Sequence, residues 1–207
     1  MSGEPASTEE AEGWIATQLF NRDEFGLVAQ ASEAHRAEHG CTLYPSTPGQ
    51  ILGAMAATAN AKRVLEIGGG YGYGTLWLAR GVGRGGRVET IERDPGHAAM
   101  ITGHALQYGF ENVISVHEGE DANVLPGLSG AYDLIVYDAD VPGPGHIPHF
   151  HRLLRRGGTL LASNLFLGRY EQDHPGLADG AAFRREMLDS SDWLCAFANL
   201  KLVAVKR

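Results

Sequence analysis

The chain has 207 residues, 43% of them hydrophobic and 20% charged, which suits one globular domain over residues 1–207 with a full core. A formal net charge of −8 argues against DNA or RNA as a partner, because phosphate binding needs a basic face. No apolar run approaches the ~20 residues of a membrane span, no signal peptide is apparent, and Cys41 and Cys195 stand in no CxxC or other metal-ligand spacing. We therefore expect a cytoplasmic protein with no membrane partner.

The first part of the chain is predicted to be helical. Helical patterns cover about Thr8–Phe20 and Glu24–His39. Thr47 is expected to cap a third helix, which has Pro48 at its first position and continues through GQILGAMAATA.

From Arg63 onward, short β-rich runs alternate with helical spans, a pattern typical of βαβ units around a parallel sheet. The expected strands are RVLEIG, RVETIE, NVISVH, YDLIVYD and GTLLAS. The expected helices are TLWLAR, about Asp94–Tyr108, near Asp121–Leu128, about His146–Arg155 and about Ala181–Leu188. The final segment, WLCAFANLKLVAVKR, predicts two strands that meet around Ala198-Asn199, so part of the sheet is expected to be antiparallel.

Five glycines occupy the seven positions 68–74, directly after the first expected strand. Doubly wound sheets bind ligands beyond the carboxyl ends of their strands, and bare backbone there lets a cofactor approach closely. The spacing does not fit the GxGxxG of dinucleotide-binding loops, and no lysine supplies the GK[ST] end of a P-loop. The stretch, Glu66 followed by GxGxG, instead resembles the first motif of S-adenosylmethionine-dependent methyltransferases.

Two acidic residues follow the next strands. Glu92 ends the second strand, where a carboxylate can accept two hydrogen bonds from a ribose diol. Asp94, with Pro95 after it, is better placed to cap the next helix, which leaves Glu92 for a ligand. Asp121, in GEDANVLP, would lie by an adenine amino group, although aspartate is also a good helix cap.

Together these motifs resemble the small O-methyltransferases typified by catechol O-methyltransferase and the caffeoyl-CoA O-methyltransferases. The resemblance runs from about Pro48 to Arg207 and rests on TPGQIL, VLEIGGGYGYGTLWLA, VETIERDP, YDLIVYDAD, RRGGTLLASNLFLG and the closing hairpin. It implies an α/β, Rossmann-like fold whose seven-stranded, mostly parallel sheet has one antiparallel strand and helices on both faces. It also implies a homodimer, with residues 1–47 contributing to the acceptor pocket or the dimer contact.

The resemblance further implies S-adenosyl-L-methionine as the methyl donor. The methionine part would lie against residues 66–74, the ribose at Glu92, the adenine by Asp121 and the donor's amino group near Asp138. The residues that it assigns to donor binding are Thr47, Glu66, Gly68, Gly70, Tyr71, Gly72, Gly74, Thr75, Glu92, Arg93, Asp121, Ala122 and Asp138.

This sequence keeps only part of the family's metal site. The family commonly binds Mg²⁺ through an aspartate that opens a DADK-like motif and through a later Asp-Asn pair, and its lysine often serves as the base. Here Asp138 opens the motif, but Val141 replaces the lysine and the later pair is Ser163-Asn164. Asp138 and Asn164 are thus candidate ligands of a divalent-metal site with one carboxylate fewer, unless Asp140 or another residue contributes.

The segment VPGPGHIPHFHRLL places His146, His149 and His151 just after the DAD motif. Histidine can act as a general base near neutral pH, and it could bind a transition metal together with Asp138. Alternatively, these histidines cover a helix surface. We take Asp138 and His146 as candidate catalytic residues, with His146 in place of the missing lysine.

The leading hypothesis is a methyltransferase that methylates a hydroxyl of a small aromatic acceptor by in-line transfer. Aromatic residues that could line the acceptor pocket, each also suited to the core, are Trp14, Phe20, Phe25, Tyr44, Phe166 and Tyr170. Three alternatives stay open. They are methyl transfer to a nitrogen or carboxylate, a non-catalytic binder of the donor or its product, and a nicotinamide dehydrogenase, which the missing GxGxxG disfavours.

Overall fold

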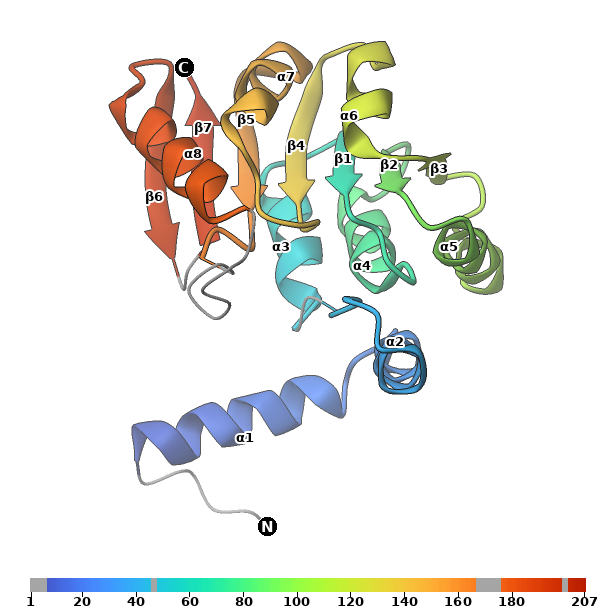
Figure 1. Cartoon of the computed structure of the whole chain (residues 1–207). Coiled ribbons are helices and arrows are strands. Elements are labelled where there is room, and N and C mark those ends of the chain that lie inside the picture. The colour runs from blue at the N-terminus through green and yellow to red at the C-terminus, as the bar shows by residue number, and fades with distance from the viewer. Residues whose placement is uncertain (1–6, 46–47, 167–175, 199–200) are drawn as a thin grey trace.

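The structure is a computed structural model that describes residues 7–45, 48–166, 176–198 and 201–207 (Figure 1). The described residues form one seven-stranded sheet in the order β3-β2-β1-β4-β5-β7-β6. The strands are β1 (Arg63–Ile67), β2 (Arg87–Glu92), β3 (Ile114–Glu118), β4 (Tyr132–Tyr137), β5 (Leu154–Ala162), β6 (Trp193–Ala198) and β7 (Lys201–Lys206). Within this sheet β7 alone runs antiparallel to its neighbours, β5 and β6. The predicted mostly parallel sheet with one antiparallel strand is therefore confirmed.

Helices cover both faces of the sheet, as predicted. Those described are α1 (Thr8–Phe20), α2 (Gly26–His39), α3 (Gln50–Thr58), α4 (Tyr73–Val82), α5 (Pro95–Gln107), α6 (Asp121–Val124), α7 (Ile147–Leu153) and α8 (Leu177–Asp189), with short 3₁₀ turns η1 (Leu125–Gly127) and η2 (Pro144–His146). Side chains of α2 to α5 pack on one face against Val64, and those of η1, α7 and α8 pack on the other against Leu65. Successive strand residues point to opposite faces, so neighbours in β1 belong to different hydrophobic clusters.

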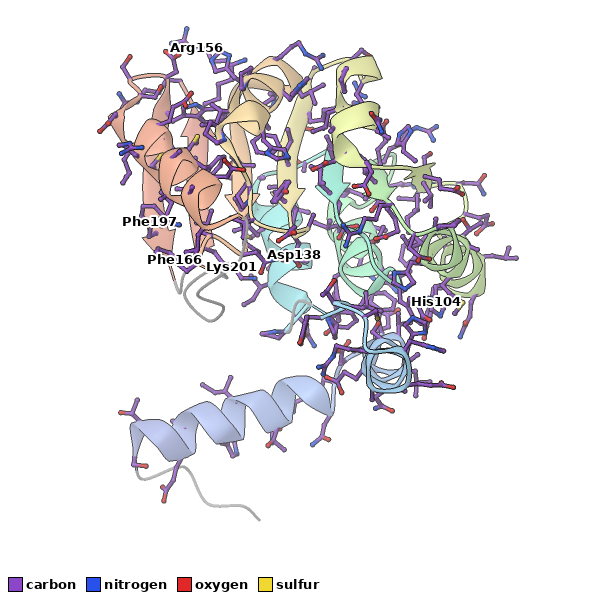
Figure 2. The ribbon with its side chains drawn as sticks, viewed as in Figure 1. His104, Asp138, Arg156, Phe166, Phe197 and Lys201 are labelled. Carbon is purple, nitrogen blue, oxygen red and sulfur yellow. The ribbon has the colours of Figure 1, made fainter. Side chains whose placement is uncertain are left out.

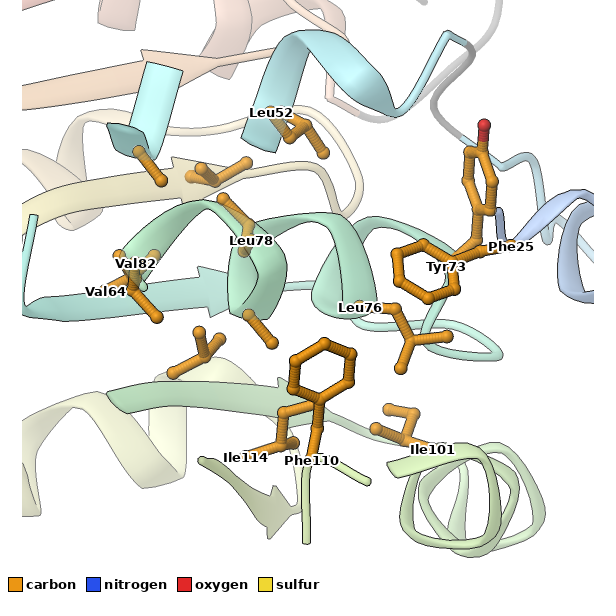
Figure 3. Packing of buried hydrophobic residues seen from close by; sticks show 14 of the residues in the cluster. Phe25, Leu52, Val64, Tyr73, Leu76, Leu78, Val82, Ile101, Phe110 and Ile114 are labelled. Carbon is orange, nitrogen blue, oxygen red and sulfur yellow. The ribbon is translucent and has the colours of Figure 1, made fainter. Parts of the chain in front are cut away.

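The N-terminal segment enters the core at Phe25, which is fully buried (Figure 3). Its ring meets those of Trp77 and Tyr108 edge-to-face, with centroids 4.9 and 5.1 Å apart. Edge-to-face pairs at this spacing add to the stabilisation that burial gives. Of the two places considered for Phe25, the core and the acceptor pocket, it therefore occupies the core.

Helix α1 extends away from the sheet and its flanking helices (Figure 1). Trp14 and Ile15 on this helix are 42% and 50% exposed. Its bounds match the predicted Thr8–Phe20. No helix in the described part of the chain combines the length and apolarity that a bilayer crossing requires.

Helix α3 begins at Gln50, two residues later than the sequence predicts, with Gly49 at the position before it. The Gly49 N–H donates to the Tyr73 hydroxyl at 3.1 Å, and a Cβ on Gly49 would lie 2.3 Å from the Trp77 ring. Close packing against α4 therefore sets where α3 starts, and Pro48 lies in the turn before the helix.

Three further boundaries differ from prediction. Strand β5 begins at Leu154, which pairs with Tyr132 of β4, so α7 ends at Leu153 rather than near Arg155. Helix α8 begins at Leu177, four residues before the predicted start.

Candidate active site

The carboxyl ends of β1, β2 and β4 bring three predicted site segments to one edge of the sheet. The Gly68 N–H donates to the Ile91 carbonyl at 2.9 Å, and the Asp138 N–H donates to the Ile67 carbonyl at 2.8 Å. Because β1 lies between β2 and β4, the strand order reverses here, which is where open α/β sheets bind ligands. Figure 2 shows Asp138 at this edge, beyond the end of β4.

Glu92 ends β2 and is buried, with 6% of the whole residue exposed. One of its oxygens accepts the Gly70 N–H at 2.7 Å, and the other accepts the Asp94 N–H at 2.9 Å. Asp94 itself caps α5 by accepting the His97 N–H at 3.0 Å, as the sequence predicts. Glu92 is thus fixed against the glycine loop, and each carboxylate oxygen still has a lone pair for a further donor.

Glu66 and Thr75 lie beneath the glycine loop, 2% and 0% exposed. One Glu66 oxygen accepts the hydroxyls of Thr75 at 2.5 Å and Thr90 at 2.8 Å. Burial raises the pKa of Glu66 to about 7; the two hydroxyls oppose this shift, and the charges of Asp138 and Glu92 add to it. These residues support the glycine loop from the core side.

The predicted donor-binding glycines are Gly68, Gly70, Gly72 and Gly74. Gly68 and Gly70 have φ of 92° and 56°, a region that L side chains rarely adopt. A Cβ on Gly68 would lie 2.8 Å from the backbone of Asp138, and one on Gly70 would lie 2.4 Å from Leu43. The sequence suggests that these glycines make room for a ligand. The packing of the protein around the loop requires glycine at these positions as well.

Asp121 and His146, predicted for different roles, form a pair. His146 Nε2 lies 3.1 Å from an Asp121 carboxylate oxygen, and the side chains are 22% and 19% exposed. Burial lowers the pKa of His146, but the hydrogen bond and charge of Asp121 outweigh it and hold the pKa above its usual value. The pKa of Asp121 is lowered by the same hydrogen bond, against the effect of burial.

The other ring nitrogen of His146 is also engaged. Nδ1 lies 3.0 Å from the backbone nitrogen of Gly143 and 3.1 Å from its carbonyl oxygen. A general base needs one ring nitrogen directed at the acceptor. His146 would therefore act as a base only after releasing either Gly143 or Asp121.

Asn164 lies against the loop that begins at Asp138. Its side-chain amide donates to the Ala139 carbonyl at 2.5 Å, and its backbone adopts the left-handed φ of 59°. Ser163, which stands where the family has a carboxylate, is 4% exposed. Mg²⁺ is usually held by one or two carboxylates plus water or substrate oxygens. Asp138 supplies one carboxylate here, so a Mg²⁺ ion would take the rest of its ligands from Asn164, water and acceptor oxygens, and we assign no step to a metal.

The remaining predicted donor-binding residues are Tyr71, Arg93, Ala122 and Thr47. The Tyr71 ring contacts the imidazoles of His35 and His97, with centroids 4.9 and 5.1 Å apart. Arg93 and Ala122 are exposed, and Thr47 lies outside the described residues.

Asp23 is a positioning residue that the sequence patterns do not single out. Its carboxylate accepts the Tyr73 hydroxyl at 2.5 Å, the Trp77 indole N–H at 3.2 Å and the Phe25 backbone N–H at 3.0 Å. It joins the N-terminal helices to α4, which follows the glycine loop. The two aromatic partners lie 50 and 54 residues away in sequence, so no local pattern could reveal them.

The other aromatic residues considered for the acceptor pocket are dispersed. Tyr44 is 68% exposed, and the Arg36 guanidinium lies 4.3 Å from its ring centroid. Phe166 follows β5, and the Arg184 guanidinium lies 4.4 Å from its ring centroid. Tyr170 and the side chain of Phe20 lie outside the described residues.

The sheet order, the glycine loop after β1 and the buried acid at the end of β2 define a Rossmann-like methyltransferase fold. The sequence profile of a family described as O-methyltransferase matches residues 29–185. The chain therefore belongs to the O-methyltransferase family. The predicted family, fold and S-adenosylmethionine-dependent O-methyltransferase class are confirmed.

Individual relatives agree with this assignment. The chain is 34% identical over 167 residues to a catechol O-methyltransferase of Mycobacterium tuberculosis, covering 80% of this chain and 76% of the relative. It is 31% identical to a catechol O-methyltransferase of Niastella koreensis, covering 75% and 72%. The crystal structure of the O-methyltransferase TomG from Streptomyces achromogenes, in complex with S-adenosylmethionine, superposes with a TM-score of 0.73 at 27% identity, covering 86% and 88%.

Proposed function

We propose that the protein transfers the methyl group of S-adenosylmethionine to a hydroxyl oxygen of a small aromatic molecule. The main support for a donor site is Glu92, a buried carboxylate at the end of β2 that also accepts a hydrogen bond from the glycine loop. The acceptor class is supported by the two catechol O-methyltransferases among the relatives.

The residues at the sheet edge fit this donor. Each Glu92 oxygen accepts one backbone N–H and can accept one ribose hydroxyl in addition. Asp121 is the first residue of α6, just after the neighbouring strand β3, where we propose that it faces the adenine. When bound, the donor supplies an electrophilic methyl group on a sulfonium centre.

We propose that the protein's part in the reaction is to align the acceptor hydroxyl with the methyl group, to exclude water and to receive the hydroxyl proton. Asp138 and His146 are the candidate proton acceptors. Asp138 lies at the edge beside the glycine loop, and His146 is paired with Asp121.

The donor site is tested by calorimetry of S-adenosylhomocysteine binding, first in EDTA and then with added Mg²⁺. Glu92→Gln keeps one acceptor oxygen for the loop but removes the charge that the ribose hydroxyls would meet. Because hydrogen bonds to charged groups contribute about 1.5–3 kcal/mol, we expect Kd to rise roughly ten- to hundredfold. Glu118→Gln, an exposed carboxylate on the adjacent strand β3, is the control and should leave Kd unchanged. Equal Kd values for wild type and Glu92→Gln would contradict the proposed site.

A non-catalytic donor-binding protein is the second candidate function. Val141 in place of the usual lysine, together with the engagement of both His146 ring nitrogens, favours it. Turnover of any hydroxyl acceptor from a panel of catechols and phenols would exclude this reading. Methylation confined to amines or carboxylic acids would instead identify a different acceptor class.

We also propose that the protein is a homodimer with a cytoplasmic location and that residues 1–47 contribute to the dimer contact. Helix α1 extends from the body of the protein with half-exposed Trp14 and Ile15. A second copy could cover this apolar surface.

A further inference from the structure

Three side chains that can bind a metal ion gather where α2 meets α5, apart from Asp138 and Asn164. His35 lies near the end of α2, Cys41 follows that helix, and His97 lies in the first turn of α5. One ligand atom from each lies within 4.8 Å of the other two. No other group of three such His, Cys, Asp or Glu atoms occurs in the described part of the chain.

Local structure explains why Cys41 lies near α2. Gly40 ends the helix in the left-handed conformation, with φ of 65°, and its N–H donates to the Arg36 carbonyl at 2.8 Å. The chain turns there and continues to Leu43, which packs on the glycine loop at Gly70. Cys41 is therefore held between α2 and the site edge.

The distance between the two imidazoles suits a shared metal ion. The Nε2 atoms of His35 and His97 face each other at 3.2 Å. A tetrahedral Zn²⁺ with two Zn–N bonds of 2.0–2.1 Å places its nitrogen ligands roughly 3.3 Å apart. The same geometry places a thiolate sulfur roughly 3.6 Å from each nitrogen, and the three ligand atoms already lie within 4.8 Å of one another.

A carboxylate stands behind one of these ligands. His97 Nδ1 lies 3.8 Å from Glu92 Oε1, and the two side chains are 14% and 8% exposed. Histidines that bind a metal through one nitrogen commonly direct the other N–H to a carboxylate, which fixes the tautomer and the ring orientation. At 3.8 Å the two groups are at ion-pair rather than hydrogen-bond distance, so Glu92 acts on His97 through its charge.

We propose that His35, Cys41 and His97 bind one Zn²⁺ ion, with water as the fourth ligand, and that the ion fastens α2 to the first turn of α5. Two imidazoles and a thiolate are the ligand types that zinc prefers over Mg²⁺. Binding forms a Zn–S bond and releases the Cys41 thiol proton to solvent. This site is separate from the candidate Mg²⁺ ligands and does not depend on catalysis.

Cobalt substitution tests the proposal in the full-length, reduced protein. Co²⁺ at a site with a cysteine ligand gives a thiolate-to-metal charge-transfer band in the near ultraviolet, together with intense visible absorption when the ion is four-coordinate. We expect both signals at one ion per chain, and we expect Zn²⁺ to abolish them by displacement. His35→Gln should weaken Zn²⁺ binding by roughly tenfold or more, measured by competition with a chromophoric chelator.

Matched variants assign the signal to its ligands. Cys41→Ser should remove the charge-transfer band, whereas Cys195→Ser, at the second free cysteine, should retain it. Asp138→Asn should also retain it, which separates this site from the sheet edge. Absence of the band in the wild-type protein, or its persistence in Cys41→Ser, would overturn the proposal.

Discussion

Glu66 is a carboxylic acid held in the core directly beneath the glycine loop. Its pKa of about 7, against an ordinary value of 4.5, means that the folded state keeps a proton that the unfolded chain has already lost. Between these two pH values the folded state binds more protons, so the free energy of unfolding falls as pH rises. Below pH 4.5 the group makes no difference to stability, and above pH 7 its destabilising effect is complete.

The variant Glu66→Gln tests this dependence, because glutamine cannot ionise. A shift of this size corresponds to about 3 kcal/mol, so we expect Glu66→Gln to gain about that much relative to wild type between pH 4.5 and pH 7.5. Urea denaturation without donor, followed at several pH values, measures the difference. Glu111→Gln, an exposed carboxylate, serves as the control. A wild-type-to-variant difference that is constant across this range would contradict the argument.

Single residues could be predicted where their signal is local. The proline after Asp94 predicts its role as a cap, and the end of the second strand predicts the position of Glu92 at the sheet edge. The proposed zinc ligands have no such signal, because His35 and His97 are 62 residues apart and only the fold brings them together. The spacing around Cys41 alone therefore gave no indication of a metal site.

At the scale of elements, the Asp121–His146 pair joins the start of α6 to the turn η2. These two elements follow different strands, β3 and β4, and both border the candidate donor site. Because the pKa of His146 is raised, the charged pair is complete below pH 6.5, as long as Asp121 is ionised, and is lost as pH rises through the pKa of His146 in the folded protein. The pair therefore links the arrangement of two loops to pH.

The dependence of kcat/KM on pH tests whether His146 is the base, once an acceptor is found. A base must be deprotonated. The pH profile should therefore have an acidic limb, in which activity falls below the pKa of His146. We expect Asp121→Asn to shift this limb to lower pH, because the charge that raises the pKa is gone. His146→Ala should remove the limb and reduce the rate roughly hundredfold or more.

A control on α7 separates the base from a merely structural role. His151 contacts Trp193, with ring centroids 5.7 Å apart, and His151→Ala should leave the pH profile unchanged. If His146→Ala lowered the rate equally at every pH and kept the acidic limb, His146 would be a positioning residue and the base would lie elsewhere.

Most strands could be predicted because each is a short β-rich run, and the central strands β1 and β4 consist almost wholly of buried residues. The start of α3 could not, since it depends on contacts of Gly49 with Tyr73 and Trp77, more than twenty residues away. The same holds for β5, whose early start follows from its pairing with β4. Where contacts with a distant segment set the start of a helix or strand, the residues near that start do not reveal it.

For the molecule as a whole, the proposed dimer makes a prediction about α1. Replacing both Trp14 and Ile15 by alanine removes apolar surface that a second copy would cover, so we expect the dimer to dissociate at least roughly tenfold more readily. Sedimentation equilibrium measures this. Leu194→Ala removes a similarly exposed apolar side chain, 58% exposed on β6, and should have no effect. A wild-type protein that is monomeric at high concentration would contradict the proposal.

The position of β7 has a consequence for biosynthesis. The six other strands of the sheet precede β7 in the chain, yet β7 lies between β5 and β6 with Leu202 and Ala204 fully buried. While the chain emerges from the ribosome, β5 therefore presents an unpaired edge, and β6 has no partner to join. Such an edge can pair with another chain until β7 arrives. The sheet is completed when β7 inserts between β5 and β6, not when a strand is added at its edge. A nascent chain stalled before Lys201 would therefore be a substrate for chaperones.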